Sequence, residues 1–516
     1  MRLIDFFDRG VLIAPTRPAF IDENGALTYR EAQLQTYQIA NALMSDGIKP
    51  GDVVAIYSPN DARAFLCMLG ILRAGAIYVN LNGLSPIAEN VYVLKNRDAR
   101  FLFIHSEFER HLGIIADQAP KIVQSVGIDQ PFKGTHSLGS WLSRHPETDP
   151  DIPRQPSDVA CLFSTGGTTG RSKAAMLTNQ VFETMIANAN TAMPHQRPPV
   201  HLVAAPFTHA AGLAALWLLP LGATNVIVAR PDPETVMAAI SRYKVTTVFL
   251  PPTMIYMMLT HPRLNEFNYS SLDYLIYGAA PMSVDKLKQA ITAFGPVLTQ
   301  LYGQAEAPMM CTVMSPSEHV RWLETGKQNR LASCGRPCLF TDLAIMSDSG
   351  TLLGPDEPGE IVVRGNLVMA GYYKNQEASA AARAYGWHHT GDIGEVDSAG
   401  YVYILDRKND MIISGGFNIY PGEIEQVLWA LPEVQDCAVV GVPHDKWGEA
   451  VTAVVELVEG AVIEEKTIIS HCKAKLGSVK APKTVLFWDS LPRSPVGKVL
   501  RRSVREKFWA GRKRAI

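Results

Sequence analysis

An α/β fold with mainly parallel sheets is the fold class that this sequence predicts. Short apolar runs of strand length alternate with amphipathic helical patterns over about the first 300 residues, which is typical of parallel sheets covered by helices on both faces. These runs are more numerous than one sheet comfortably holds, so two related α/β subdomains are expected. A change of pattern after Ser333 predicts a small antiparallel unit and then a separate C-terminal domain.

The N-terminal elements follow one another in a regular order. Thr28 stands where a helix N-cap is expected, before an amphipathic pattern, and a Pro-Gly turn leads into the buried strand pattern at 53–57. The further predicted strands are 76–79, 101–105, 121–128, 159–163, 174–177, 225–228, 246–250, 274–277 and 297–302. The predicted helices among them are 62–74, 210–219, 233–243, 253–260 and 283–294.

The segment after Ser333 has a different pattern of polar and apolar residues. Strands with polar alternation at 342–345 and 360–364 lie between turn clusters, which predicts an antiparallel subdomain, with a barrel as one form that it can take. From about Met411 the pattern is mixed again, and about a hundred residues suffice for an independent domain. Its predicted helices are 421–431 and 465–476, and its predicted strands are 434–442 and 450–457.

Length, net charge and cysteine content argue against some classes of protein. The 516 residues suggest two to four domains, and the net charge of −2 argues against a globally basic nucleic-acid binder. The seven cysteines are scattered, and the only close pair, Cys334 and Cys338, lacks nearby histidines for a zinc site. Reduced thiols and the lack of an evident signal peptide favour a cytoplasmic protein. The oligomeric state, a homodimer included, is left open.

One long stretch, 198–229, contains no Asp, Glu, Lys or Arg and resembles a membrane span in its hydropathy. Pro206, Gly212, Pro220 and Gly222 interrupt it, so an unbroken spanning helix does not fit. A buried helix followed by a buried strand is expected there, with no stable membrane insertion.

The segment 164–173, with the sequence STGGTTGRSK, follows the predicted strand 159–163 and is rich in glycine, hydroxyl and cationic side chains. Such a loop lets the backbone approach an anion closely, so phosphate is the expected ligand. A plain surface loop is the alternative. A P-loop does not fit, because Arg171 follows Gly170 where that motif needs Lys. A second strand, and then a helix capped by Thr178 or Asn179, is expected after the loop.

Six further motifs occur in a fixed order: APFTHAAG at 205–212, YGAAP at 277–281, LYGQAE at 301–306, GWHHTGD at 386–392, DRKNDMIISGGFNIYP at 406–421 and LPRSPVGK at 491–498. Together with 164–173 they resemble the adenylate-forming superfamily of acyl- and aryl-CoA synthetases, peptide-synthetase adenylation domains and luciferases. The resemblance covers nearly the whole chain.

The resemblance implies an architecture and a reaction. A large N-terminal adenylation domain at 1–408, made of two α/β subdomains and a small β-barrel, is joined by a hinge to a mobile α+β C-terminal domain at 409–516. The carboxylate of the acid attacks the α-phosphate of ATP, pyrophosphate leaves, and the thiol of coenzyme A then displaces AMP. The reaction joins two anions, so catalysis is expected to be positioning and electrostatics.

The resemblance also implies residue roles. Lys498 matches the catalytic lysine, although a solvated lysine is the plainer interpretation, and Glu306 matches the Mg²⁺-binding glutamate, an oxygen ligand that suits this ion. Asp392 and Arg407 match the ribose contacts. Ala305 stands where the family usually has a threonine that contacts the phosphate, so this hydrogen bond is either lost or supplied instead by Thr165 or Thr168. The implied nucleotide-site positions are Ser164, Thr165, Gly166, Gly167, Thr168, Thr169, Gly170, Lys173, Gly278, Ala279, Ala280, Tyr302, Gly303, Gln304 and Ala305.

The C-terminal domain would supply the second half-reaction. Asn409 stands at the hinge position, where Asp or Lys is usual, and Ser414, Gly415 and Gly416 would edge the pantetheine tunnel. Trp447 resembles a tunnel-wall residue of some aryl-CoA ligases, and a core tryptophan is the alternative. The basic cluster near the C-terminus would meet CoA phosphates or be a solvated tail.

The implied substrate pocket is small and apolar, with His209 gating it or packing on the adenylate. Its members are His209, Ala210, Gly212, Gly278, Gly303, Pro308 and Met309. Because they offer no partner for a second charge, a hydrophobic aromatic or medium-chain monocarboxylate is expected. The alternatives are an enzyme that loads a carrier protein or releases acyl-AMP and, from a different class, a P-loop-type NTPase or a non-catalytic nucleotide-binding protein.

Overall fold

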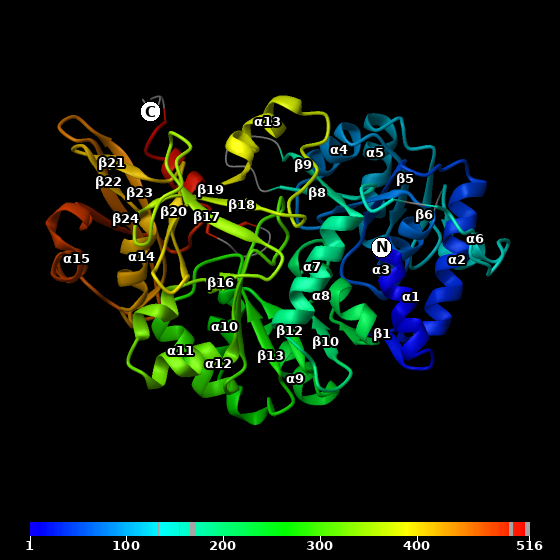
Figure 1. The fold of residues 1–516 in the computed structure, drawn as a ribbon, viewed down its shortest axis with the longest axis horizontal. Coiled ribbons are helices and arrows are strands. Elements are labelled where there is room, and N and C mark those ends of the chain that lie inside the picture. Colours follow the sequence, from blue (N-terminus) through cyan, green and yellow to red (C-terminus); the bar gives the residue numbers. More distant parts are fainter. Residues whose placement is uncertain (133, 154, 166–171, 495–498, 511–516) are drawn as a thin grey trace.

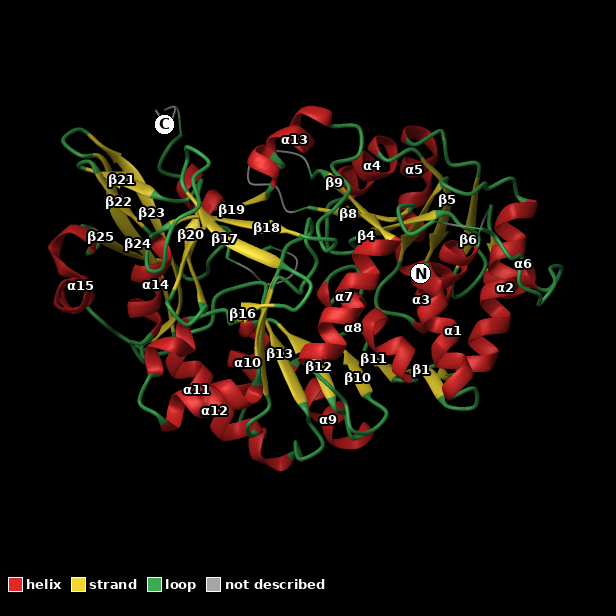
Figure 2. Ribbon diagram, viewed as in Figure 1, coloured by secondary structure: helices red, strands yellow, loops and turns green. Residues whose placement is uncertain are grey.

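The computed structural model describes residues 1–132, 134–153, 155–165, 172–494 and 499–510. In Figure 1 the chain runs from an N-terminal α/β region on the right, through a second α/β region below, to a C-terminal region at the upper left. Helices and strands alternate through both α/β regions (Figure 2), as the sequence predicts. The predicted α/β fold class is confirmed.

The larger of the two α/β sheets has nine strands, in the order β16-β15-β14-β13-β12-β10-β11-β1-β2. The strands from β14 to β1 pair in parallel, and antiparallel pairs close both edges. The bounds are β1 Pro18–Asp22, β2 Gly25–Thr28, β10 Val200–Val203, β11 Thr224–Ile227, β12 Thr247–Leu250, β13 Tyr274–Tyr277, β14 Leu298–Tyr302, β15 Thr312–Met314 and β16 Arg336–Pro337.

A seven-stranded sheet forms the other α/β region, in the order β7-β6-β5-β3-β4-β8-β9. All of its pairs are parallel except β8–β9, which is an antiparallel hairpin. The bounds are β3 Val53–Tyr57, β4 Ile77–Leu81, β5 Ala99–Ile104, β6 Gln124–Gly127, β7 His136–Ser137, β8 Val159–Ser164 and β9 Ala174–Thr178. The two sheets confirm the predicted pair of α/β subdomains.

The small third unit is an antiparallel sheet in the order β17-β18-β19-β20. The resemblance implies a barrel at this point, yet in the described residues the end strands β17 and β20 do not pair. Four strands are too few to close around packed side chains, so the sheet stays open. The bounds are β17 Asp342–Met346, β18 Gly359–Arg364, β19 His388–Val396 and β20 Val402–Arg407.

The C-terminal region contains a sheet in the order β22-β21-β24-β23, with β25 paired in parallel to β24. Its own apolar core includes Ile424, Leu428, Val451 and Ile468, all fully buried. The bounds are β21 Ile412–Ser414, β22 Phe417–Ile419, β23 Val434–His444, β24 Gly448–Leu457 and β25 Thr484–Phe487. This region therefore has a hydrophobic core of its own.

The α-helices of the described residues cover these sheets. They are α1 Leu3–Ile13, α2 Tyr29–Ser45, α3 Ala62–Arg73, α4 Ile87–Asn96, α5 Leu112–Gln118, α6 Leu138–Leu142, α7 Asn179–Ala192, α8 Ala210–Leu218, α9 Pro233–Tyr243, α10 Pro252–Leu259, α11 Val284–Phe294, α12 Pro316–Glu324, α13 Gln376–Ala381, α14 Pro421–Trp429, α15 Glu465–Lys480 and α16 Arg501–Glu506.

Local sequence explains how these helices begin. Thr28 caps α2 by accepting from the N–H of Glu31, whose carboxylate accepts in return from the N–H of Thr28. Thr178 caps α7 through the N–H of Val181. Each cap satisfies an amide that the first helical turn leaves without a partner.

The sequence misplaced some boundaries. The strand predicted at 121–128 begins only at Gln124, because the N–H of Ile122 donates to the carbonyl of Ala119 in a turn. The charge-free stretch 198–229 holds β10, the buried helix α8 and the buried strand β11, as expected. Of the helices that the structure describes, none has the length and apolar character needed to cross a membrane. All seven cysteines are free and buried.

Candidate active site

The glycine-rich segment connects two antiparallel strands. Ser164 ends β8 and pairs with Ala174, which begins β9. The amide of Thr165 donates to the carbonyl of Lys173 at 3.0 Å and joins the two ends of the segment. This arrangement confirms the predicted strand–loop–strand order. Of the predicted phosphate-binding positions, Gly166, Gly167, Thr168, Thr169 and Gly170 lie outside the described residues.

Three predicted loops meet at one edge of the nine-stranded sheet. His209 follows β10, Gly278 follows β13 and Gly303 follows β14, and these strands are parallel. The residues that follow parallel strands gather at the carboxyl edge of a sheet, where open α/β folds bind their ligands. The same loops carry the other predicted positions Ala279, Ala280, Gln304, Ala305, Pro308 and Met309, and α8 carries Ala210 and Gly212.

Tight backbone packing shapes these loops. A Cβ on Gly303 would stand 2.4 Å from the amide nitrogen of Met309, and one on Gly278 would stand 2.6 Å from the carbonyl oxygen of Leu301. Ala279 and Met309 adopt left-handed φ angles of 65° and 57°, which cost conformational energy for residues other than glycine and gather at functional sites. Both strained residues stand at predicted site positions, Ala279 in the adenine wall and Met309 in the acid pocket.

A buried carboxylate anchors the centre of the site. Asp392 on β19 is 4% exposed and lies opposite Arg407 on β20, with 2.7 Å between its Oδ1 and the arginine Nε. Its Oδ2 accepts from the Tyr302 hydroxyl and from Nε2 of Gln304, both at 2.7 Å. Four predicted nucleotide-site residues from distant parts of the chain therefore form one cluster.

Burial and charge in this cluster raise the pKa values of Arg407 and Tyr302. The Asp392 carboxylate raises the pKa of Arg407 above its usual value, despite the opposing effect of burial. Burial raises the pKa of the Tyr302 phenol well above 10, so the hydroxyl stays a donor at all physiological pH values. The carboxylate is held by three donors and is preorganised to accept further hydrogen bonds from ligand hydroxyls.

A second cluster surrounds Glu306. Its Oε1 accepts from the Tyr372 hydroxyl at 2.7 Å, and the Nζ of Lys173 lies 4.7 Å from the centroid of the Tyr372 ring. Tyr372 thus connects the predicted metal-binding carboxylate to the predicted phosphate-binding lysine. Sequence reasoning missed Tyr372, because nothing in its local sequence sets it apart and only the fold brings it 66 positions back to Glu306.

His209 lies at the N-terminal end of α8, where it is partly buried. Its Nδ1 is 2.7 Å from the Thr208 hydroxyl, and its ring packs edge-on to Phe163 with 6.3 Å between centroids. Burial lowers its pKa from 6.5 to about 4. A neutral imidazole is therefore expected at this wall of the predicted acid pocket at neutral pH, which suits an apolar ligand.

Acid sensitivity follows from the buried histidines. Burial lowers the pKa of His209, and likewise of His201, His319 and His388, to about 4. In the unfolded chain these groups take up protons near pH 6.5, so the unfolded state gains stability as pH falls from 6.5 toward 4. We expect a clearly lower melting temperature at pH 5 than at pH 7.5, measured by calorimetry. An unchanged melting temperature would contradict these four assignments.

The C-terminal candidates form a separate group. The amide of Gly415 donates to the carbonyl of Trp447 at 2.9 Å, and Ser414 pairs with Gly448. The Trp447 ring stacks on His444 with 4.3 Å between centroids. In Figure 1 β21 and β22 lie at the upper left, well away from β8 and β9. This structure thus brings the predicted tunnel residues Ser414, Gly415, Gly416 and Trp447 together, but not up to the phosphate-binding segment.

Lys498, the predicted catalytic lysine, lies outside the described residues. The chain on both sides of it is anchored in the C-terminal domain. Arg493 binds Asp436 at 2.7 Å and Glu456 at 3.1 Å, and the amide of Leu500 donates to the carbonyl of Pro492 at 2.8 Å.

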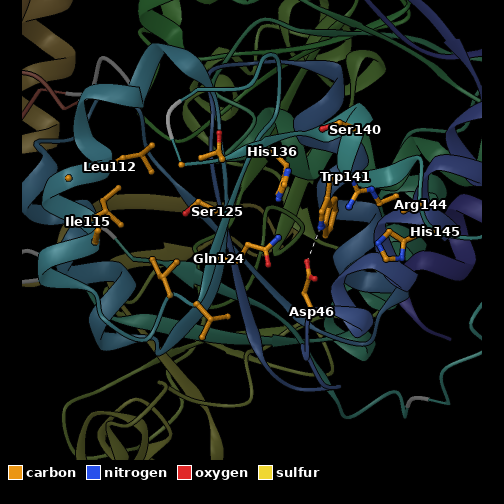
Figure 3. Close-up of a pocket in the computed structure, with 16 residues that line it drawn as sticks. Asp46, Leu112, Ile115, Gln124, Ser125, His136, Ser140, Trp141, Arg144 and His145 are labelled. Atoms are coloured by element: carbon orange, nitrogen blue, oxygen red, sulfur yellow. Dashed lines mark hydrogen bonds between the residues drawn. The ribbon is translucent and has the colours of Figure 1, made fainter.

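A pocket of about 770 Å³ lies elsewhere, beside β6 and β7 (Figure 3). Trp141, whose indole N–H donates to Asp46 at 2.8 Å, forms one wall, and Leu112 and Ile115 form the other. None of its 16 lining residues is a predicted site residue. The clusters around Asp392 and Glu306 contain the residues that the motifs predict for the site, and they form the candidate active site.

Comparisons with known proteins identify the family of this chain. The AMP-binding enzyme family model matches residues 7–373, and the AMP-binding enzyme C-terminal domain model matches 423–498. A feruloyl-CoA synthase of Amycolatopsis sp is 35% identical over 511 residues, covering 97% of this chain and 98% of that protein. A medium/long-chain-fatty-acid–CoA ligase of Mycobacterium tuberculosis is 34% identical over 496 residues, covering 93% of this chain and 85% of that protein.

The fold has solved counterparts as well. The amide bond synthetase McbA from Marinactinospora thermotolerans superposes with a TM-score of 0.89 at 28% identity, covering 98% of this chain and 100% of that chain. The matched motifs, the two-sheet architecture and the relatives lead to the same assignment. The chain belongs to the AMP-binding enzyme family, within the adenylate-forming superfamily of acyl- and aryl-CoA synthetases.

Proposed function

We propose that this chain is an ATP-dependent carboxylate–CoA ligase that forms an acyl-adenylate and then an acyl-CoA. The observation that carries the proposal is the buried Asp392 cluster at the carboxyl edge of the nine-stranded sheet, in a chain of the AMP-binding enzyme family. The enzyme uses ATP and coenzyme A as substrates and releases AMP and pyrophosphate. Its relatives include a feruloyl-CoA synthase and a medium/long-chain-fatty-acid–CoA ligase.

Asp392 would bind the ribose of ATP. Its two oxygens are already oriented by Arg407, Tyr302 and Gln304, so binding a sugar diol requires little rearrangement. A ribose held there positions the α-phosphate for the incoming carboxylate. Lys498 would neutralise the negative charge that develops as the carboxylate oxygen bonds to phosphorus and the bond to pyrophosphate breaks.

Glu306 would hold a Mg²⁺ ion. Mg²⁺ usually takes one or two protein carboxylates and completes its shell with phosphates and water, so a single glutamate can serve as its protein ligand. The hydroxyl of Tyr372 orients the Glu306 carboxylate from one side. Bound Mg²⁺ would offset the charge of the phosphate chain.

Asn409 would be the hinge between a domain of residues 1–408 and a domain of residues 409–516. In this structure α16 bridges the two sides of Asn409, because Arg501 pairs with Asp406 before it and with Glu425 after it. Arg505 donates to the carbonyl of Asn409 at 3.2 Å. A rotation at Asn409 must break the contact with Asp406, and it would bring the face around Ser414 and Trp447 to the adenylate.

The substrate would be a hydrophobic monocarboxylic acid, aromatic or medium-chain. Support comes from the neutral His209 and from the small or apolar residues of the three loops at the sheet edge. An unpaired charge buried there would cost several kcal/mol. The free, buried cysteines support a cytoplasmic location, and a homodimer remains an expectation.

A panel of acids tests the substrate class. We expect pyrophosphate release with cinnamate-like and medium-chain acids to exceed that with malonate or an amino acid by about 100-fold, because a second charge finds no partner. The measurement is kcat/KM for each acid at saturating ATP and CoA. Malonate or an amino acid as the best acid would overturn the proposed substrate class but leave the reaction class standing.

A further inference from the structure

Two arginines of the described residues are almost fully buried, and their surroundings differ sharply. Arg73 is 0% exposed and binds the carboxylates of Asp8 at 2.7 Å and Asp149 at 3.1 Å. Arg97 is 1% exposed, yet no carboxylate of the described residues pairs with it, and its Nε has no hydrogen-bond partner there. A buried cation without a counter-ion costs several kcal/mol, so Arg97 calls for a functional explanation.

Within the residues that the structure describes, the side-chain hydrogen bonds of Arg97 go to the ends of the glycine-rich segment. Its Nη1 donates to the Ser164 hydroxyl at 2.8 Å. Its Nη2 donates to the carbonyl of Lys173 at 3.3 Å and to the Ser172 hydroxyl at 3.4 Å. One guanidinium from the end of α4 therefore joins the last residue of β8 to the residues just before β9.

The same guanidinium reaches the Glu306 cluster through Lys173. Arg97 holds the backbone of Lys173, and the side chain of Lys173 lies over the ring of Tyr372. The Tyr372 hydroxyl in turn donates to Glu306. The next residue, Asp98, accepts from the Tyr373 hydroxyl at 3.1 Å and from the Lys374 ammonium. Arg97 thus contacts the ends of the glycine-rich segment, and Asp98 contacts Tyr373 and Lys374. The proposed function places both of these segments around the phosphates.

We propose that Arg97 is a positioning residue for ATP, which holds the ends of the phosphate-binding segment together and supplies a buried positive charge that the triphosphate compensates. The proposal rests on the proposed function, because only a bound polyphosphate would provide the missing counter-charge. A bound triphosphate would also explain why the cation is tolerated without a carboxylate partner among the residues that the structure describes. Burial lowers the pKa of Arg97 to about 10, so the side chain remains charged at neutral pH.

Loss of Arg97 should affect the two half-reactions differently. Adenylate formation needs the triphosphate, whereas thioester formation from supplied acyl-AMP does not. A residue that serves the phosphate chain should affect the KM for ATP and leave the second step unchanged. A residue that only supports the fold should impair both steps and the melting temperature together.

The test compares R97M, R97Q and R97K with the wild-type enzyme. Met and Gln remove the charge, and Gln keeps a donor in case the apolar variant fails to fold. We expect both to raise the KM for ATP by about 10- to 100-fold, the usual range for lost charge-assisted hydrogen bonds, with thioester formation from acyl-AMP within about twofold of wild type. R97K keeps the charge but not the planar fork, so it should rescue part of the loss.

R100M is the matched control. Arg100 is three residues further on, 38% exposed and paired with Asp52 at 2.6 Å. Removing a surface pair of this kind should leave the KM for ATP within about twofold of wild type.

A binding measurement gives a readout independent of turnover. Inorganic tripolyphosphate should raise the melting temperature of the wild type and of R100M, but much less that of R97M and R97Q, while the shift caused by adenosine should be equal in all four. Equal tripolyphosphate shifts, or an unchanged KM for ATP, would overturn the proposal. If neither neutral variant folds, R97K decides, and a KM for ATP equal to that of wild type would then overturn it.

The two proposals fail in different ways. A wild type that makes no acid-dependent AMP contradicts the proposed ligase function, whereas the tripolyphosphate shifts still test Arg97. A ligase that is active in wild type and unaffected in R97Q contradicts only the role of Arg97.

Discussion

Asp392→Ala is expected to lower the rates of both half-reactions by about 100-fold, because it removes the carboxylate proposed to bind the ribose in ATP and in the adenylate. The change also leaves Arg407, Tyr302 and Gln304 without their common acceptor. The measurements are kcat/KM for ATP in pyrophosphate exchange and the rate of thioester formation from supplied acyl-AMP and CoA.

Asp342→Ala is the control for this variant. Asp342 pairs with Arg364 at 2.9 Å, but its side chain is 64% exposed, so its loss should leave both rates near those of wild type. A folded Asp392→Ala enzyme that keeps one half-reaction at its full rate would show that Asp392 does not bind the part common to both nucleotides.

Lys498→Ala is expected to lower adenylate formation by about 100-fold or more and to leave thioester formation from supplied acyl-AMP close to wild type. The reason is that the lysine is assigned to the charge that develops at the α-phosphate, and removing one preorganised group of this kind usually costs at least this much. The same two assays measure the split between the steps.

Lys473→Ala provides the matched control for Lys498. Lys473 is an exposed lysine of α15 in the same C-terminal region, and its loss should not change either step. Equal losses in both half-reactions of Lys498→Ala would contradict the assigned role, because a fault in folding or domain movement would then explain the data better.

Much of the fold and part of the site could be predicted from the sequence, because the signals are local. Apolar runs such as Val53–Tyr57 become buried strands, and Thr28 and Thr178 cap the helices that follow them. The motifs also predicted that Asp392 and Arg407 belong to one site, and the two residues are direct partners on adjacent strands.

The remainder depends on contacts between distant segments. Tyr372 meets Glu306 only after the segment 372–374 has docked beside β9, where the Tyr373 amide donates to the carbonyl of Ala174. In the sequence, Arg97 follows an ordinary helix and has the character of a solvated charge. Only the folded structure shows that Arg97 is buried and donates to the Ser164 hydroxyl. The motifs likewise did not reveal that the small antiparallel sheet stays open, because closure into a barrel depends on strand number and tilt.

The central claim is that this chain activates a carboxylic acid as its adenylate and transfers the acyl group to coenzyme A. The most direct measurement is product analysis of purified enzyme with ATP, Mg²⁺, CoA and a hydrophobic acid, by chromatography and mass spectrometry. We expect AMP, pyrophosphate and the acyl-CoA in equal amounts, all dependent on the acid. ADP with phosphate, nucleotide cleavage without any need for the acid, or an acyl-AMP that accumulates without thioester would contradict it.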